Sequence, residues 1–292
     1  MRDAFSEYHP LVNFAFFALV LAFTMIFSHP ACLAVSLVCS LMFRVYLNRG
    51  KAARFGLAFL LPALLAAALI NPAFNHEGGT ILAYLPGGNP LTLESALYGA
   101  ASAVTLISVI NWFSCFNVVM TSDKFIYLSG RALPAASLIL SMSLRLVPRF
   151  KAQIKEIENA RKCIGRGAGS GTPLQRARGG MLILSVMVSW ALENSIETAD
   201  SMKSRGYGLP GRTAFSIYRF GRRDRAALCF LAACAAYIIA GAATGGLYFR
   251  YFPTLKGNLT VSVCLVYFAL CASPVAINLL EDIKWKAIES KT

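Results

Sequence analysis

The sequence predicts an all-α integral membrane protein with about six transmembrane helices and a cytoplasmic domain of about three long helices. Two observations predict this class. First, 57% of the 292 residues are hydrophobic and only 14% are charged, whereas soluble chains carry about 25% charged residues. Second, several apolar runs approach the ~20 residues that a helix needs to cross a bilayer, and the basic residues gather in one segment between such runs.

The first two spans are expected at Leu11–Phe27 and Ala31–Leu47. The link between them is so short that the two helices are predicted to form a tight antiparallel hairpin. No cleavage site of small residues follows the first run, so we expect a retained helix and not a signal peptide. Arg49 and Arg54 lie in the basic loop after the second span, which is expected in the cytoplasm together with the N-terminus, because cytoplasmic loops carry an excess of Lys and Arg.

A third span is expected at Phe55–Ile70 and a fourth at Ser95–Met120. The loop between them, from Asn71 to Pro90, contains glycine pairs and prolines but no Lys or Arg. It is therefore predicted to lie outside the cell, with a short strand at Thr80–Leu85.

The segment Thr121–Arg225 holds 18 of the 28 Lys and Arg residues but only 7 of the 14 Asp and Glu residues. Its apolar runs, Leu133–Leu144 and Met181–Leu192, are about 12 residues long, which is more typical of buried or interfacial helices than of spans. A carboxylate such as Glu193 at membrane depth costs at least about 2.5 kcal/mol. We therefore expect three helices close to the inner face of the membrane, and the alternative that residues 181–192 cross it stays open.

Two further spans, at Ala226–Phe249 and Leu259–Leu280, and a lysine-containing tail complete the chain. A count of six spans places both termini in the cytoplasm. The predicted domains are an N-terminal transmembrane bundle at residues 1–120, a cytoplasmic helical domain at 121–225, and a C-terminal transmembrane hairpin and tail at 226–292.

Two helical patterns in the cytoplasmic segment end in an arginine that is followed by glycine. The first reads Gly165-Arg166-Gly167 and the second Ser204-Arg205-Gly206. A cation in the last turn of a helix complements the helix dipole, and Gly206 is a natural residue for a left-handed helix stop. The two arginines are 39 residues apart, so an intervening helix of ~30 residues, about 45 Å long, would separate their guanidinium groups.

Two interpretations of these arginines stay open. Each can be a simple capping charge, or the pair can dock two separate partners through bidentate bonds from guanidinium to carboxylate. A third arginine before a glycine, Arg178, lies early in its helix, where a cation opposes the dipole, and it is set aside for that reason.

Motifs for catalysis and cofactor binding are absent from the sequence, which contains no Walker A, G-x-S-x-G or H-E-x-x-H pattern and no histidines at metal-ligand spacing. No predicted span carries a charge away from its ends, as an ion-coupled carrier usually needs. We expect a non-catalytic protein that binds no cofactor, metal or nucleic acid directly. The alternatives are a membrane-embedded enzyme that uses the cytoplasmic helices as its site, and a stand-alone secondary carrier.

Residues from about 8 to 210 resemble the T component, the transmembrane coupling subunit, of energy-coupling factor (ECF) transporters, a branch of the ABC transporters. That family has two short Ala-Arg-Gly motifs at the ends of cytoplasmic coupling helices. Asp200–Gly208 is similar to the second motif, Ala160–Gly167 to the first, and Ser141–Phe150 to the stretch before the first. The motif alanines are replaced here by Gly165 and Ser204, and glycine weakens a helix by up to about 1 kcal/mol relative to alanine.

The resemblance implies that Arg166 and Arg205 each dock into a groove of one of two ABC ATPase subunits, with ATP and Mg bound by those subunits. The docking residues would include the flanking small residues, namely Gly165, Gly167, Ser204 and Gly206. The resemblance also implies a small membrane-embedded S component that captures a vitamin or a transition-metal ion, in the plasma membrane of a prokaryote. The chain would convert ATP-driven closure of the ATPases into movement of the S component.

Overall fold

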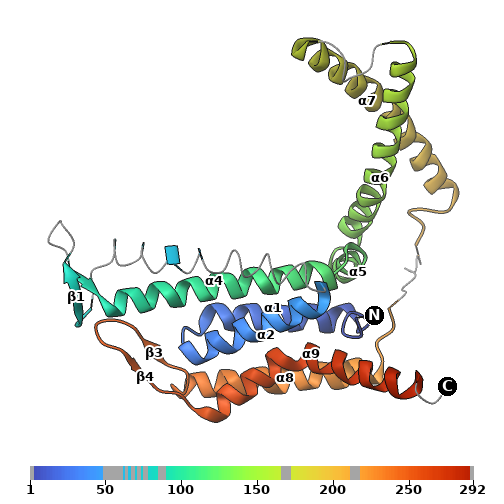
Figure 1. The fold of residues 1–292 in the computed structure, drawn as a ribbon. Coiled ribbons are helices and arrows are strands. Elements are labelled where there is room, and N and C mark those ends of the chain that lie inside the picture. Colours follow the sequence, from blue (N-terminus) through green and yellow to red (C-terminus); the bar gives the residue numbers. More distant parts are fainter. Residues whose placement is uncertain are drawn as a thin grey trace. The chain divides into compact units, whose positions relative to one another are not determined.

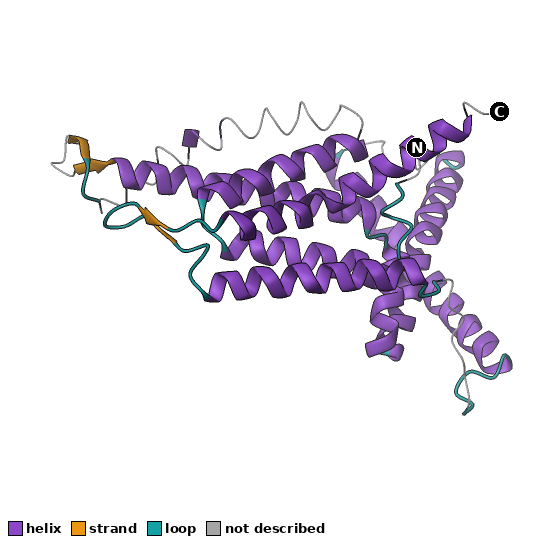
Figure 2. Cartoon of the chain, turned by 90° about the horizontal axis from the view of Figure 1, so that it is seen from below, coloured by secondary structure: helices purple, strands orange, loops and turns teal. Residues whose placement is uncertain are grey.

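The computed structural model describes residues 3–48, 78–84, 90–165, 172–210 and 218–289, and the single positions 62, 65, 66, 70 and 74. These residues form eight α-helices and two short antiparallel strand pairs, so the predicted all-α class is confirmed (Figures 1 and 2). The chain divides into two compact units. The first, here called the bundle, combines Met1–Phe125 with Tyr218–Thr292, and the second, the central unit, is Ile126–Ile217.

The bundle is built from apolar helices that are far apart in the sequence. They are α1 (Pro10–Ile26), α2 (Pro30–Asn48), α4 (Leu93–Val119), α8 (Arg222–Ala243) and α9 (Val261–Glu289). Helix α2 packs mainly against α4 and α9, and α1 packs mainly against α4 and α8. The predicted tight hairpin of the first two helices is therefore only a minor contact, because both helices bury their apolar faces against later ones.

The starts of α1 and α2 share one local design. His9 precedes Pro10, and His29 precedes Pro30. Each imidazole Nδ1 accepts a hydrogen bond, at 3.2 Å, from the backbone N–H two residues later. Proline tolerates the first helical position because its missing N–H would be unpaired there in any case. Two of the three histidines thus serve as helix caps.

Four helices meet at a buried hydrogen-bonded cluster. Thr24 Oγ1 in α1 lies 2.8 Å from Ser36 Oγ in α2 and 3.2 Å from the hydroxyl oxygen of Tyr267 in α9, and Trp112 Nε1 in α4 donates to Ser36 Oγ at 3.0 Å. All four side chains are at most 1% exposed. A buried polar group costs free energy unless it is hydrogen-bonded, so this cluster favours one arrangement of the four helices.

Helices α2, α4, α7, α8 and α9 are long and apolar enough to cross a membrane, and α1 is a shorter apolar helix of 17 residues. The predicted spans at Leu11–Phe27, Ala31–Leu47 and Ser95–Met120 thus coincide with α1, α2 and α4. The predicted third span at Phe55–Ile70 lies almost entirely outside the described residues, so the count of six stays a prediction.

The last two predicted spans have different ends in the structure. Helix α8 ends at Ala243 and not at Phe249, because Thr244 caps it and Gly245 turns the chain with a φ of 78°. Phe249 belongs instead to a strand. Helix α9 continues to Glu289, well past the predicted end at Leu280. The charged residues after Leu280 end the apolar run, but they do not end the helix.

Two short strand pairs mark one end of the bundle, here called the hairpin end. Strand β1 (Ile81–Tyr84) pairs with β2 (Pro90–Thr92), which confirms the strand predicted at Thr80–Leu85. Strand β3 (Phe249–Arg250) pairs with β4 (Lys256–Gly257).

The opposite end, here called the charged end, carries hydrogen bonds of charged side chains. The Tyr46 hydroxyl donates to Asp282 Oδ2 at 2.8 Å. Lys124, only 5% exposed, donates to Ser6 Oγ and to the carbonyl oxygen of Val119, both at 2.9 Å. Burial lowers the pKa of Lys124. These bonds tie the N-terminal segment to the first turn of α5 (Ser122–Ala132), the helix in which the bundle ends and the central unit begins.

Candidate docking ends of helices α6 and α7

The central unit contains the rest of α5 and two long helices, α6 (Pro134–Cys163) and α7 (Pro173–Ser204). Prolines stand at the first position of both long helices. Gly130 allows α5 and α6 to approach closely, because a Cβ at this position would lie 2.9 Å from Ser137 Oγ. The Ser137 hydroxyl also donates to the carbonyl oxygen of Ile126 at 3.1 Å. Three helices were predicted here, and two of them are long.

Helices α6 and α7 cross one another (Figure 1), and three side-chain contacts described here join them. Near the end of α6, the guanidinium of Arg161 donates to the carbonyl oxygen of Gly179 in the second turn of α7. Further along, the ring of Phe150 meets the ring of Trp190 edge to face at 5.7 Å, and Arg149 lies 6.0 Å from the same indole. Aromatic pairs and cation–π contacts each contribute about 0.5–1.5 kcal/mol.

The end of α7 is closed by a Schellman motif. The N–H of Tyr207 donates to the carbonyl oxygen of Met202, and the N–H of Gly206 donates to that of Lys203, both at 3.0 Å. Gly206 has a φ of 78°, a left-handed conformation that glycine adopts without steric cost. The prediction that Gly206 ends this helix is confirmed.

Arg205 is the cap residue of α7, one position beyond the predicted last turn. Its side chain is exposed, and among the residues that the structure describes no hydrogen bond or ion pair engages its guanidinium. Within the described part of the chain, the Ser204 hydroxyl donates only to its own helix, to the carbonyl oxygen of Ser201 at 2.9 Å. The tip of α7 thus presents an unshared guanidinium on a rigid helix end.

The first arginine motif begins at a similar stop. Helix α6 ends at Cys163 and not at Arg166 as predicted, because Gly165 turns the chain with a φ of 74° and donates its N–H to the carbonyl oxygen of Lys162 at 3.0 Å. Arg166 and Gly167 lie outside the described residues. The predicted pairing of Glu158 with Lys162 is confirmed by an ion pair of 2.9 Å.

Helix α7 lies between the two motifs in the chain. Its 32 residues give a length of about 48 Å at 1.5 Å per residue, close to the predicted 45 Å. It starts with a capping box of Thr172 and Gln175, which places Arg178 in the second turn, as predicted. Thus Arg178 lies far from the helix end that Arg205 occupies.

Most of α7 is apolar and uncovered. In the described part of the helix only Gly179 and Met187 are buried. Seven of its large apolar side chains are between 45% and 74% exposed, namely Met181, Leu182, Leu184, Val186, Val188, Leu192 and Ile196. Exposed apolar surface of this extent is typical of a contact with a partner or with lipid. The sequence predicts the apolar run, but it does not predict the contacts of Trp190, the one tryptophan within that run.

The fold and this site define a class: an integral membrane protein of apolar helices with a second unit of long helices, one of which ends in an exposed arginine. The chain belongs to the CbiQ family of cobalt transport proteins, whose family model matches residues 8–215. The matched region ends before α8 begins, so it includes both arginine motifs and the first part of the bundle.

Curated relatives support the same assignment. The chain is 30% identical over 95 residues to the energy-coupling factor transporter transmembrane protein EcfT of Lactobacillus helveticus, a match that covers 32% of this chain and 34% of that protein. It is 33% identical over 89 residues to EcfT of Lacticaseibacillus paracasei, covering 30% and 34%, and 29% identical over 96 residues to EcfT of Leuconostoc gelidum, covering 32% and 36%. The chain therefore matches about a third of the length of each relative.

Proposed function

We propose that this protein is the transmembrane coupling component of an ECF-type transporter, acting in the plasma membrane of a prokaryote with both termini in the cytoplasm. Its family and the names of its relatives support a transporter membrane component. The observation that carries the coupling role is the end of α7, where a closed helix stop leaves the guanidinium of Arg205 exposed and unshared.

In this proposal the two arginine motifs dock two ABC ATPase subunits. A guanidinium at a rigid helix tip can enter a groove and make bidentate bonds to a carboxylate. Arg205 would fill one ATPase groove, and Arg166 would fill the other. Gly165 and Gly206, with Gly167 and Ser204, keep the approach to each groove free of bulky side chains. The length of α7 keeps the two docking ends on separate subunits.

The uncovered apolar face of α7 supports a second partner, a small membrane-embedded S component that binds the substrate. Seven large apolar side chains along one helix form a long apolar surface, and removing such a surface from water is favourable. A partner that docks there would move with α7. Closure of the ATPases, driven by their own ATP and Mg, would pull on both helix ends and so shift the S component.

The substrate class follows from the partner and not from this chain. A vitamin or a transition-metal ion is proposed, and the family description names cobalt transport. The chain itself contributes force transmission and binds no nucleotide. Its role is therefore non-catalytic in this proposal.

The test is uptake by cells that express this chain with its ATPases and S component. Replacing both Arg166 and Arg205 by alanine should lower uptake by at least tenfold, because truncating one partner of a buried charge pair costs about 2–5 kcal/mol. The matched control is Arg178→Ala, which removes one exposed arginine from the second turn of α7 and should leave uptake unchanged. Normal uptake by the double variant, at equal membrane abundance, would refute the docking role.

A further inference from the structure

A groove in the bundle opens at the charged end, between α1, α8 and α9. Its volume is about 480 Å³. Five small side chains from α8 and α9 line it and are here called the floor, namely Ala226, Ala227, Ala269, Ser273 and Ala276. Because these side chains are small, they leave a space between the helices. Larger apolar side chains also line the groove, among them Phe230, which is 45% exposed, and Leu280.

The mouth of this groove, at the charged end of the bundle, carries one arginine. Arg223 lines it, donates from Nη2 to Glu281 Oε1 at 2.8 Å, and lies 5.5 Å from the ring of Tyr8. The arginine side chain is 72% exposed. A guanidinium carries five N–H donors, so it can bind a further anion while it keeps its bond to Glu281.

Other basic and aromatic side chains follow on the same two helices. Arg222 and Arg225 are exposed in the same first turn of α8, but helical spacing turns both away from the face that Arg223 and Phe230 share. On α9, the groove residues Ala276 and Leu280 continue by helical spacing to Lys284, which is exposed as well. Trp285 beside it is 62% exposed, and exposed tryptophans at span ends lie at the level of lipid headgroups.

We propose that this groove binds one anionic phospholipid, with an acyl chain along the alanine floor and the headgroup phosphate on Arg223. An apolar groove that ends in an arginine matches a molecule with one anionic head and an apolar tail. Basic pockets between transmembrane helices bind anionic headgroups in this way. The proposal goes beyond the transport role, and it does not depend on the arginine motifs of the central unit.

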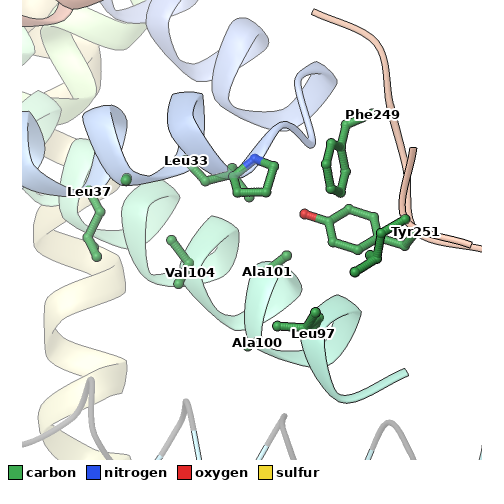
Figure 3. A pocket seen from close by; sticks show the side chains of 11 residues that line it. Leu33, Leu37, Leu97, Ala100, Ala101, Val104, Phe249 and Tyr251 are labelled. Carbon is green, nitrogen blue, oxygen red and sulfur yellow. The ribbon is translucent and has the colours of Figure 1, made fainter. Parts of the chain in front are cut away.

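A second groove, at the hairpin end, is apolar and has no arginine among the residues that line it. It has a volume of about 310 Å³ and lies between α2, α4 and the β3–β4 hairpin. Figure 3 shows the ring of Phe249 next to that of Tyr251, and the Tyr251 ring beside Ala101. Among the residues that the structure describes, no charged side chain lines this groove, so they offer no partner for a phosphate, and the groove serves as the matched control.

A transmembrane helix of another protein is the competing occupant of the groove at the charged end. Such a helix would fill the alanine floor but would place an apolar or neutral surface against Arg223. The basic mouth is complementary to an anionic head, and it therefore favours the lipid. A second copy of this chain would also bring its own arginine to the mouth, which like charges oppose.

The test is native mass spectrometry of the full-length protein released from nanodiscs of phosphatidylcholine with added phosphatidylglycerol. The wild-type protein should retain one phosphatidylglycerol molecule under conditions that remove phosphatidylcholine. Arg223→Gln should lower this occupancy about fivefold, which corresponds to about 1 kcal/mol per basic residue at an anionic surface. Glu281→Gln should keep or raise the occupancy, because it frees Arg223 and removes a competing negative charge.

Matched variants separate the groove from general effects of charge and volume. Ala276→Phe fills the floor and should abolish retention, whereas Ala101→Phe fills the control groove and should not. Arg250→Gln removes an exposed arginine at the hairpin end and should leave retention unchanged. Arg223→Gln changes an exposed side chain, so it stays informative even where Ala276→Phe fails to fold.

Three results would overturn the proposal. The first is equal retention of both lipids by the wild-type protein. The second is displacement of the bound phosphatidylglycerol by millimolar inorganic phosphate alone, which would indicate a phosphate site without a lipid tail. The third is release of a dimer without lipid, or a partner helix in place of the lipid, which would assign the groove to a protein contact.

Discussion

The N–H of Tyr207 donates a hydrogen bond to the carbonyl oxygen of Met202 at 3.0 Å. This bond closes α7 one residue after Gly206 and leaves Arg205 as the cap residue. The position of the arginine is therefore set by backbone geometry and not by contacts of its own side chain. The free guanidinium and the fixed backbone together make this helix end suited to docking.

Gly206→Ala should destabilise the end of α7 by about 1 kcal/mol or more, because alanine is strained at a φ of 78°. The added Cβ would also lie 3.1 Å from Leu209 Cδ1. Hydrogen exchange should become faster at the amides of Gly206 and Tyr207 while the bundle stays unchanged. Unchanged exchange at these amides would show that the motif does not depend on glycine.

The neighbouring substitution Ser204→Ala is the matched control for that change. Among the described residues, the Ser204 hydroxyl donates only to Ser201 in its own helix, and alanine is the better helix former by roughly 0.5 kcal/mol. Exchange at the helix end should be equal or slower, and uptake should be preserved. A loss of uptake with intact exchange would assign the hydroxyl a role in docking.

Trp190→Leu should loosen the α6–α7 pair. It removes the edge-to-face contact with Phe150 and the cation–π contact with Arg149, which together contribute about 1–3 kcal/mol. The opening free energy from hydrogen exchange should fall in both helices of the central unit. Leu184→Ala, at a residue that is 64% exposed, controls for the loss of apolar volume and should change this opening free energy little.

Thr24→Val should lower the free energy of unfolding of the bundle by about 1–3 kcal/mol, because it removes the hydroxyl that pairs with Ser36 and Tyr267. Thermal unfolding in detergent measures this change. Thr105→Val is the control, since the Thr105 hydroxyl donates to the carbonyl oxygen of Ala101 in its own helix and to no other helix among the described residues. Equal effects of both variants would argue against a special role for the cluster.

Stability should depend on pH through Asp3. Burial raises the pKa of this carboxyl, although Asn278 Nδ2 donates to it at 2.7 Å. The folded protein then binds more protons than the unfolded chain, so the free energy of unfolding should fall as pH rises from the ordinary value of 3.8 through the raised one, and level off above it. Asp3→Asn should remove this fall, as thermal unfolding at a series of pH values will show.

Much of the fold could be predicted because apolar runs of span length and the distribution of Lys and Arg reflect the membrane directly. Helices α1, α2 and α4 are predicted in this way, whereas strand β1 is predicted within a loop that contains glycine pairs and prolines. The predicted ends of α8 and α9 were wrong for two reasons. Gly245 ends α8 within an apolar run, and charged residues continue α9 beyond its apolar run. Contacts such as Trp112 with Ser36 could not be predicted, because they join residues that only the folded chain brings together.

The candidate site was predicted in part. The glycine stop at Gly206 follows from local backbone chemistry, which a sequence records well. The end of α6 was predicted at Arg166, beyond its actual end at Cys163. Several glycines follow one another in this segment, and more than one of them can end a helix. The crossing of α6 and α7 through Arg161 and Gly179 was missed, since a bond to a backbone carbonyl leaves no side-chain pattern.

The most direct test of docking is co-purification of the tagged chain with its ATPases. The wild-type protein and Arg178→Ala should each retain two ATPase subunits per chain through a detergent wash. The variant with both Arg166→Ala and Arg205→Ala should retain none while its S component and bundle stay intact. Retention of two ATPase subunits by that double variant would contradict the account.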